Sequence, residues 1–128
     1  DTVTRDGDST AQAMKSVVTD LTTYDWEGDE RLHHPFSKTV IYEAHVGGFT
    51  RHESSQVATA KRGTFAGFIE KIPYLQALGI TAVELLPVFQ FDPQEAPAGL
   101  VNYWGYNPIA FFAPQQGYAS GNNPLHVL

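Results

Sequence analysis

The sequence predicts an α/β fold in which a strand, a helix and a second strand follow one another. Residues 39–46 are rich in β-branched and aromatic side chains, which is typical of a strand. In residues 64–78, apolar side chains recur at spacings of three and four, which is typical of a helix with one apolar face. Residues 80–88 are almost all apolar, as in a parallel strand buried on both faces. Together the three patterns predict a βαβ unit.

Composition and charge exclude several classes of protein. The chain has 128 residues, of which 42% are hydrophobic and 17% charged, unlike an intrinsically disordered protein. No apolar run reaches the ~20 residues of a membrane-spanning helix. There is no cysteine, so disulfides, thiolate nucleophiles and cysteine-bound zinc are excluded. The net charge of −6 argues against a basic surface for nucleic acid.

Acidic residues are concentrated near the start of the sequence. Residues 1–30 carry eight acidic and two basic side chains, whereas the rest of the chain carries six of each. We therefore expect residues 1–36 to form an acidic, irregular segment and residues 37–128 to form the α/β region. The first eight residues do not resemble a signal peptide, so we expect a cytoplasmic protein unless the natural chain begins further upstream.

The predicted elements have recognisable ends. Gly47 and Gly48 are expected to end the first strand and to open a loop. Thr64 is a suitable N-cap for the helix, and Gly79 can adopt the left-handed conformation that ends it. Pro73 lies inside the helical pattern and is expected to kink or divide the helix at the residue before it. The apolar face of the helix is expected to consist of Phe65, Phe68, Ile69, Ile72, Leu75 and Leu78.

The sequence after residue 88 is aromatic and is expected to form loops. Four prolines interrupt residues 89–118 and exclude a long helix there. Two parallel strands and one helix leave sheet edges and one sheet face uncovered. We therefore infer that this region is the early part of a larger α/β domain, or that it needs a partner.

Two carboxylates are candidates for acid–base chemistry. Glu43 shares one face of the first strand with His45, and Glu84 lies on the second strand. A glycosidase needs a pair of carboxylates, but the same residues also fit a structural role in ion pairs. The glycines do not form a phosphate-binding motif, and the adjacent His33 and His34 do not suit one metal ion. We expect no metal and no cofactor.

Residues 102–108 (NYWGYNP) form the strongest local signal. Aromatic faces suit the C–H faces of a sugar ring, and they suit a hydrophobic core equally well. Asparagine side chains supply both donors and acceptors for hydroxyl groups. A sugar site and a core role therefore both remain open here. The position of the segment is compatible with a site, because ligands in α/β folds bind at loops that follow the carboxyl ends of parallel strands.

Several stretches resemble the alpha-amylase superfamily of glycoside hydrolases. Residues 40–50 resemble the first barrel strand and its loop. Residues 63–75 resemble the first helix, and residues 78–88 resemble the second barrel strand. Within that superfamily, the sequence is most similar to the isoamylase and glycogen-debranching branch. The stretches that carry this similarity are residues 102–108, 112–114 and 118–120, and residues 13–18 and 24–29.

The resemblance implies a fold and a reaction. The chain would be an incomplete (β/α)8 TIM barrel, with its first two strands, its first helix and a long aromatic loop, and residues 37–128 would be the start of the catalytic domain. The reaction would be retaining hydrolysis of α-1,6 branch points in α-glucans. The catalytic carboxylates of the family lie on later strands, so we expect no catalytic residue in this segment, and Glu43 and Glu84 would not be the catalytic pair.

The resemblance also implies which residues bind substrate. Tyr106 matches the family tyrosine that stacks on the sugar at the cleavage site, and Trp104 and Tyr103 flank it. The expected partners are an α-glucan (glycogen, amylopectin or a derived oligosaccharide) and the remainder of the barrel, with no nucleic acid and no membrane. Two alternatives stay open, namely a fragment of a glucan-branching glucosyltransferase, against which residues 106–108 argue, and a non-catalytic glucan-binding module.

Overall fold

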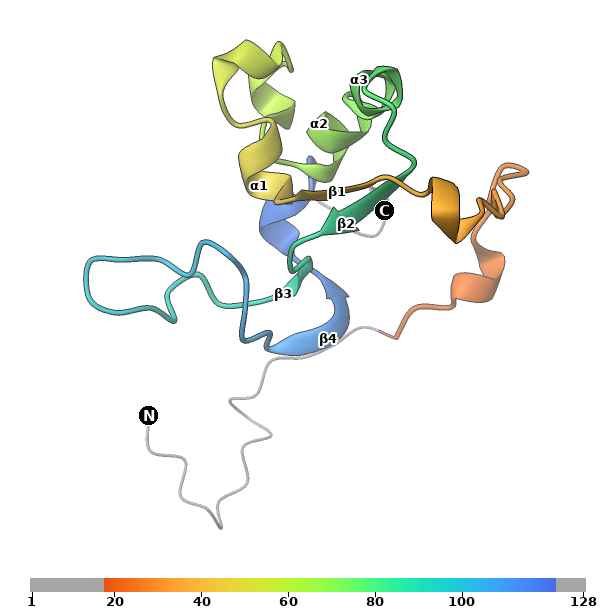
Figure 1. Ribbon diagram of the computed structural model, residues 1–128. Coiled ribbons are helices and arrows are strands. Elements are labelled where there is room, and N and C mark those ends of the chain that lie inside the picture. Colours follow the sequence, from red (N-terminus) through yellow and green to blue (C-terminus); the bar gives the residue numbers. More distant parts are fainter. Residues whose placement is uncertain (1–17, 122–128) are drawn as a thin grey trace. The chain divides into compact units, whose positions relative to one another are not determined.

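The computed structural model describes residues 18–121 (Figure 1). These residues belong to two compact units that divide between His33 and His34. In the first unit the described residues contain one 3-10 turn, Leu21–Thr23, and no strand. Residues 1–17 of the expected acidic segment, which include most of the resemblance at 13–18, lie outside the described residues.

The second unit is built around two parallel strands, β1 and β2, which form a two-stranded sheet. Its register pairs Glu43 with Glu84 and Tyr42 with Val83. The predicted βαβ unit is confirmed, since helices connect these two strands (Figure 1). The elements are β1 (Ile41–Ala44), α1 (Val46–Phe49), α2 (Phe65–Ile69), α3 (Ile72–Ala77) and β2 (Ala82–Leu85).

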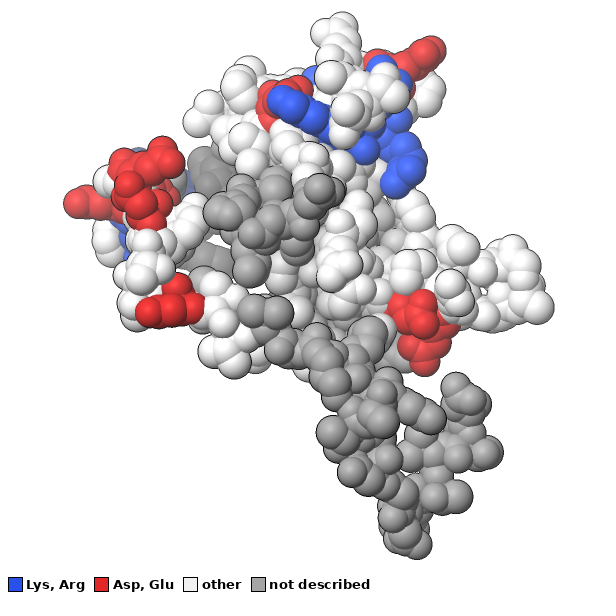
Figure 2. All heavy atoms as spheres, turned by 180° about the vertical axis from the view of Figure 1, so that it is seen from behind, with Lys and Arg blue, Asp and Glu red and all other residues white. Residues whose placement is uncertain are grey.

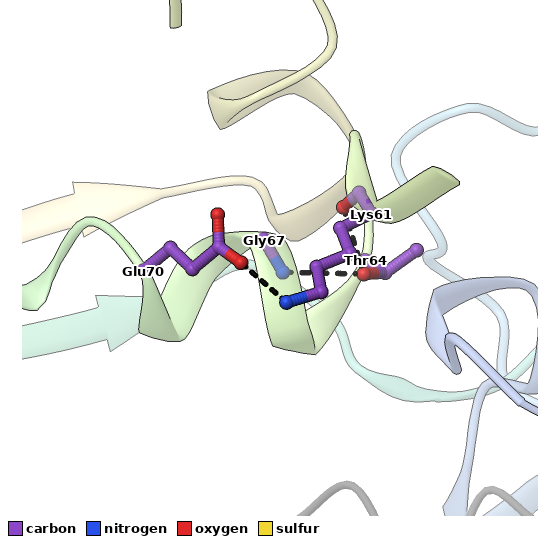
Figure 3. A network of polar contacts seen from close by, with 4 residues as sticks. All are labelled: Lys61, Thr64, Gly67 and Glu70. Atoms are coloured by element: carbon purple, nitrogen blue, oxygen red, sulfur yellow. Dashed lines mark hydrogen bonds and ion pairs between the residues drawn. The ribbon is translucent and has the colours of Figure 1, made fainter. Parts of the chain in front are cut away.

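The predicted single helix is divided into α2 and α3, as Pro73 indicates. The side chain of Thr64 caps α2 by accepting a hydrogen bond from the Gly67 N–H at 3.2 Å (Figure 3). Pro73 lies in the first turn of α3, where its missing N–H leaves no hydrogen bond unmade. Proline thus begins the second helix instead of bending a continuous one.

The turn from α3 into β2 depends on Gly79. This glycine has a φ of +86°, in the left-handed region. Its N–H bonds to the Gln76 carbonyl at 2.9 Å, and the Ile80 N–H bonds to the Leu75 carbonyl at 3.0 Å. This pair of bonds is a Schellman motif, which satisfies the last carbonyls of the helix and directs the chain into the next strand. The predicted role of Gly79 is confirmed.

The prediction for Gly47 and Gly48 is wrong. Both glycines lie inside the single turn of α1 and not in an open loop. The strand ends earlier than expected, at Ala44, and His45 is the N-cap of α1. A capping side chain therefore overrides the low helix propensity of the two glycines.

The core of this unit lies between the sheet and the helices. The apolar face predicted for residues 64–78 is only partly buried, because Ile69, Ile72 and Leu78 are exposed. The prediction that β2 is buried on both faces is also wrong for the described residues, since Val83 is 41% and Leu85 is 40% exposed. The buried cluster consists of Ala44, Val46, Phe65, Phe68, Leu75, Phe91 and Tyr118.

A second sheet follows, where only loops were expected. Strand β3 (Phe89–Gln90) pairs antiparallel with β4 (Ala110–Pro114), with an irregular register. The buried side chain of Gln115 donates from Nε2 to the Phe91 carbonyl at 3.1 Å. Short 3-10 turns complete the described chain, at Phe36–Lys38, Glu53–Ser55, Thr59–Lys61 and Gln116–Tyr118.

Charged side chains lie outside this core. Most of the Lys and Arg side chains visible in Figure 2 lie together near the top of the view, next to acidic side chains. Lys61 and Glu70 form an ion pair beside α2 (Figure 3). Both side chains are almost half exposed, so this pair contributes about 0–1 kcal/mol. None of the helices in the part of the chain that the structure describes is long and apolar enough to cross a membrane.

The isolated 128-residue polypeptide is expected to self-associate. Val83 and Leu85 leave apolar surface and a strand edge open, and burying such a side chain is worth ~1.5–3 kcal/mol. Sedimentation velocity at increasing protein concentration measures this association. The double variant Val83→Thr, Leu85→Thr should associate less, because it makes the same surface more polar. A sharp, cooperative melt of a strictly monomeric wild-type species would contradict the prediction.

Candidate functional site

The aromatic loop, residues 102–106, is a tight turn fixed by Asn102. The Asn102 side chain accepts from the Gly105 N–H at 3.1 Å and donates from Nδ2 to the Tyr106 carbonyl at 2.8 Å. Its own N–H bonds to the Pro93 carbonyl at 2.8 Å. Gly105 has a φ of +80°, and a Cβ there would lie 2.8 Å from Cε1 of Phe91. Only glycine therefore fits this position without moving the loop.

The three rings predicted to bind substrate are exposed to different degrees. Tyr103 is 42%, Trp104 is 54% and Tyr106 is 61% exposed. The Tyr103 and Trp104 rings meet edge to face, with centroids 5.1 Å apart. Within the described residues, Tyr106 has no aromatic neighbour. The structure thus brings Tyr103 and Trp104 together and leaves the Tyr106 ring accessible.

His45 joins this loop to the end of β1. Its Nδ1 lies 2.9 Å from the Gly48 nitrogen, and its Nε2 lies 2.9 Å from the Tyr103 carbonyl oxygen. A backbone N–H can only donate and a carbonyl can only accept, so Nδ1 is unprotonated and Nε2 carries the hydrogen. The Tyr118 hydroxyl oxygen lies 3.0 Å from Nε2 and is the second acceptor of a bifurcated hydrogen bond from the Nε2–H group. These bonds define a neutral imidazole.

Aromatic rings surround His45. The Tyr103 ring stacks on it at a centroid distance of 4.5 Å, and the Trp104 and Tyr118 rings meet it edge-on at 5.6 and 5.8 Å. The stacking needs glycine at position 48, because a Cβ there would lie 2.7 Å from the Tyr103 hydroxyl oxygen. The glycine after the strand thus makes room for the aromatic loop.

Burial favours the neutral forms of His45 and Tyr118. It lowers the pKa of His45 below its ordinary value, and the positive charge of Arg51 lowers it further, against a raising effect from the bond to the Tyr103 backbone. Burial also raises the pKa of the Tyr118 hydroxyl, as does Tyr103, while Arg51 lowers it. A neutral imidazole beside the Tyr118 hydroxyl is suited to holding a loop in place.

The two candidate carboxylates lie side by side but away from the core. Glu43 and Glu84 are partners in the parallel register, so their side chains leave the same face of the sheet. Both residues are exposed. His45, expected on the same strand face as Glu43, lies just past the end of β1 and is the N-cap of α1. No group of three His, Asp or Glu side chains within residues 18–121 is arranged to hold a metal ion.

Sequence reasoning missed the role of His45 and Tyr118. The Gly47–Gly48 pair beside a histidine was a usable signal, because small residues mark a close approach of another segment. The approaching segment could not be identified from the sequence, since Tyr103 and Tyr118 lie 58 and 73 positions away.

Known proteins match most of this chain but only a small part of their own length. No family model matches. The chain is 51% identical over 117 residues to a glycogen debranching enzyme of Klebsiella pneumoniae, covering 88% of this chain and 18% of that protein. It is 41% identical over 117 residues to the chloroplastic isoamylase 1 of Oryza sativa, covering 90% of this chain and 14% of that protein. The chain therefore spans less than a fifth of these curated relatives.

Solved structures also match most of this chain but only a small part of their own length. A pullulanase from Anoxybacillus sp. LM18-11, complexed with maltotetraose, matches 85% of this chain and 18% of its own, with a TM-score of 0.66 and 31% identity. A type I pullulanase from Bacillus subtilis, complexed with maltose, matches 68% of this chain and 13% of its own, with a TM-score of 0.54 and 38% identity.

Proposed function

Since the chain belongs to the isoamylase-type branch of the alpha-amylase superfamily, we propose that it is part of an enzyme that hydrolyses α-1,6 branch points of glycogen or starch. The observation that carries this proposal is the 51% identity to a glycogen debranching enzyme over 117 residues. The whole protein would be a retaining glycoside hydrolase, with two carboxylates that act as nucleophile and acid/base.

In this proposal the second unit begins a (β/α)8 barrel. A parallel strand pair with a helical crossover is the repeating unit of such a barrel. Residues 37–128 would supply the first two barrel strands and the aromatic loop, and residues 1–36 would lead into the barrel. The remainder of the barrel would cover Val83 and Leu85, which are exposed here.

The aromatic loop would contribute to the glucan site. It lies in the chain after β2, and active sites of (β/α)8 barrels are built from the loops that follow the strands. The Tyr106 ring would stack on a glucose ring, and Trp104 and Tyr103, which flank it in the sequence, would add to the aromatic surface of the loop. The pullulanases that this chain resembles were solved with maltose and maltotetraose, which supports an α-glucan as the ligand.

The test is an assay of the full-length protein on amylopectin and glycogen. Hydrolysis of α-1,6 bonds creates one new reducing end for each bond cleaved, so the number of reducing ends should rise as branch linkages disappear. A branching glucosyltransferase would leave the number of reducing ends unchanged while branch linkages increased. A glucan-binding module would bind amylopectin without altering it. Either of these results would overturn the proposal.

A further inference from the structure

We propose that His45 is a positioning residue, which holds the aromatic loop against the carboxyl end of β1 and thereby sets the place of the Tyr106 ring. This inference rests on the proposed function, because Tyr106 is the ring proposed to stack on the glucan. It concerns a residue that contacts no substrate and acts through the loop.

The link between strand and loop is direct. His45 follows the last residue of β1, and its Nε2–H bonds to the Tyr103 carbonyl at 2.9 Å. The stacked Tyr103 ring, at 4.5 Å, adds a second contact between the same two residues. His45 is only 8% exposed, so water cannot readily replace this bond. The position of Tyr103 is therefore set by the imidazole.

The loop transmits this position to Tyr106. Asn102 bonds to both Gly105 and the Tyr106 carbonyl, which closes the turn around Tyr103 and Trp104. The far side of the turn rests against Phe91 at Gly105. A short turn closed in this way moves as one body, so a shift at Tyr103 moves the backbone of Tyr106.

Only the neutral imidazole can both hold the loop and cap α1, because the cap needs an unprotonated Nδ1 while the bond to Tyr103 needs the hydrogen on Nε2. Protonation of Nδ1 would place an N–H against the Gly48 N–H and break the cap of α1. The titratable or charged groups that face His45 are Tyr103, Tyr118 and Arg51, and no carboxylate among the described residues is placed to favour the imidazolium. The site thus favours the form that can accept at Nδ1 and donate at Nε2.

Two substitutions separate the functions of the two ring nitrogens. In His45→Asn, the amide oxygen occupies the place of Nδ1 and can still cap α1, but nothing reaches Tyr103. In His45→Gln, the longer amide can donate to the Tyr103 carbonyl, but the cap is weakened. If His45 positions the loop, the Gln variant keeps more activity than the Asn variant. If His45 matters only as a helix cap, the order is reversed.

The decisive measurement is a double-mutant cycle with Tyr106→Ala, made in the full-length protein with amylopectin as substrate. His45→Asn should lower kcat/KM about tenfold, the effect of one hydrogen bond. In the Tyr106→Ala background the same change should lower kcat/KM less than about twofold, because the ring to be positioned is gone. Equal losses in both backgrounds would mean a general structural effect and would overturn the inference.

A second variant keeps the test valid if His45→Asn does not fold. Gly48→Ala leaves the imidazole in place but puts a Cβ 2.7 Å from the Tyr103 hydroxyl oxygen, which displaces that ring. Its loss of kcat/KM should likewise depend on Tyr106, and an equal loss in the Tyr106→Ala background would overturn the inference. Glu70→Gln, which breaks the surface ion pair with Lys61, is the matched control and should leave kcat/KM unchanged.

The outcomes also distinguish the inference from the proposed function. A wild-type protein that does not cleave the α-1,6 branch points of amylopectin would refute the function itself. A wild-type protein that debranches amylopectin, with Tyr106→Ala equally active, would refute the positioning role and leave hydrolysis standing.

Discussion

The isolated 128-residue chain is expected to release no reducing sugar from pullulan, glycogen or amylopectin, whereas the full-length protein does. In the proposed barrel the catalytic carboxylates lie outside this segment. Glu43 and Glu84 are adjacent, but both are exposed on the sheet, and the resemblance places the catalytic carboxylates on other strands. We therefore expect no measurable activity from the isolated chain.

Reducing-sugar release by equal molar amounts of the two proteins measures this difference. The variants Glu43→Gln and Glu84→Gln of the isolated chain are the controls. Activity of the isolated chain above the blank, abolished by either substitution, would reinstate these carboxylates as catalytic residues.

Tyr106→Ala in the full-length protein is expected to lower kcat/KM roughly 30-fold. This corresponds to a loss of about 2 kcal/mol of transition-state stabilisation, the contribution of one aromatic side chain packed on a substrate. The ring would support the sugar as it flattens toward an oxocarbenium-like transition state. Tyr106→Phe should keep most of the activity if stacking dominates, and lose much of it if the hydroxyl group orients a carboxylate.

Thermal stability provides the complementary measurement for this variant. The Tyr106 ring is 61% exposed in the described structure, so its removal should change Tm little. A lowered Tm together with an unchanged kcat/KM of the folded enzyme would identify Tyr106 as a core residue. Both quantities should be measured on the same preparation.

Local features of the fold could be predicted because their causes are local. The βαβ unit follows from side-chain periodicity, and the ends of α2 and α3 follow from Thr64, Pro73 and Gly79. Each of these residues acts on backbone groups within a few positions of itself. Such effects are present in any window of the sequence and need no tertiary contact.

Features that depend on distant partners could not be predicted. Strand β3 has only two residues, and its pairing partner β4 begins 20 positions later. The position of His45 depends on Tyr103, and the exposure of Val83 and Leu85 depends on which segments pack against β2. In the candidate site, the aromatic loop was found by its composition, while the substrate role of Tyr106 stays a prediction.

The pairing of Glu43 with Glu84 limits what can pack against the sheet. The other face, with Tyr42 and Ala44, meets the core, so the two carboxylates lie on the face that the helices leave open. Two ionised groups side by side repel one another, and covering them with apolar atoms would remove their hydration without compensation. A layer that closes over this face must therefore bring arginine, lysine, histidine or amide donors. A purely aliphatic layer would pack there unfavourably, so the segment that packs against this face is expected to be complementary to it in charge.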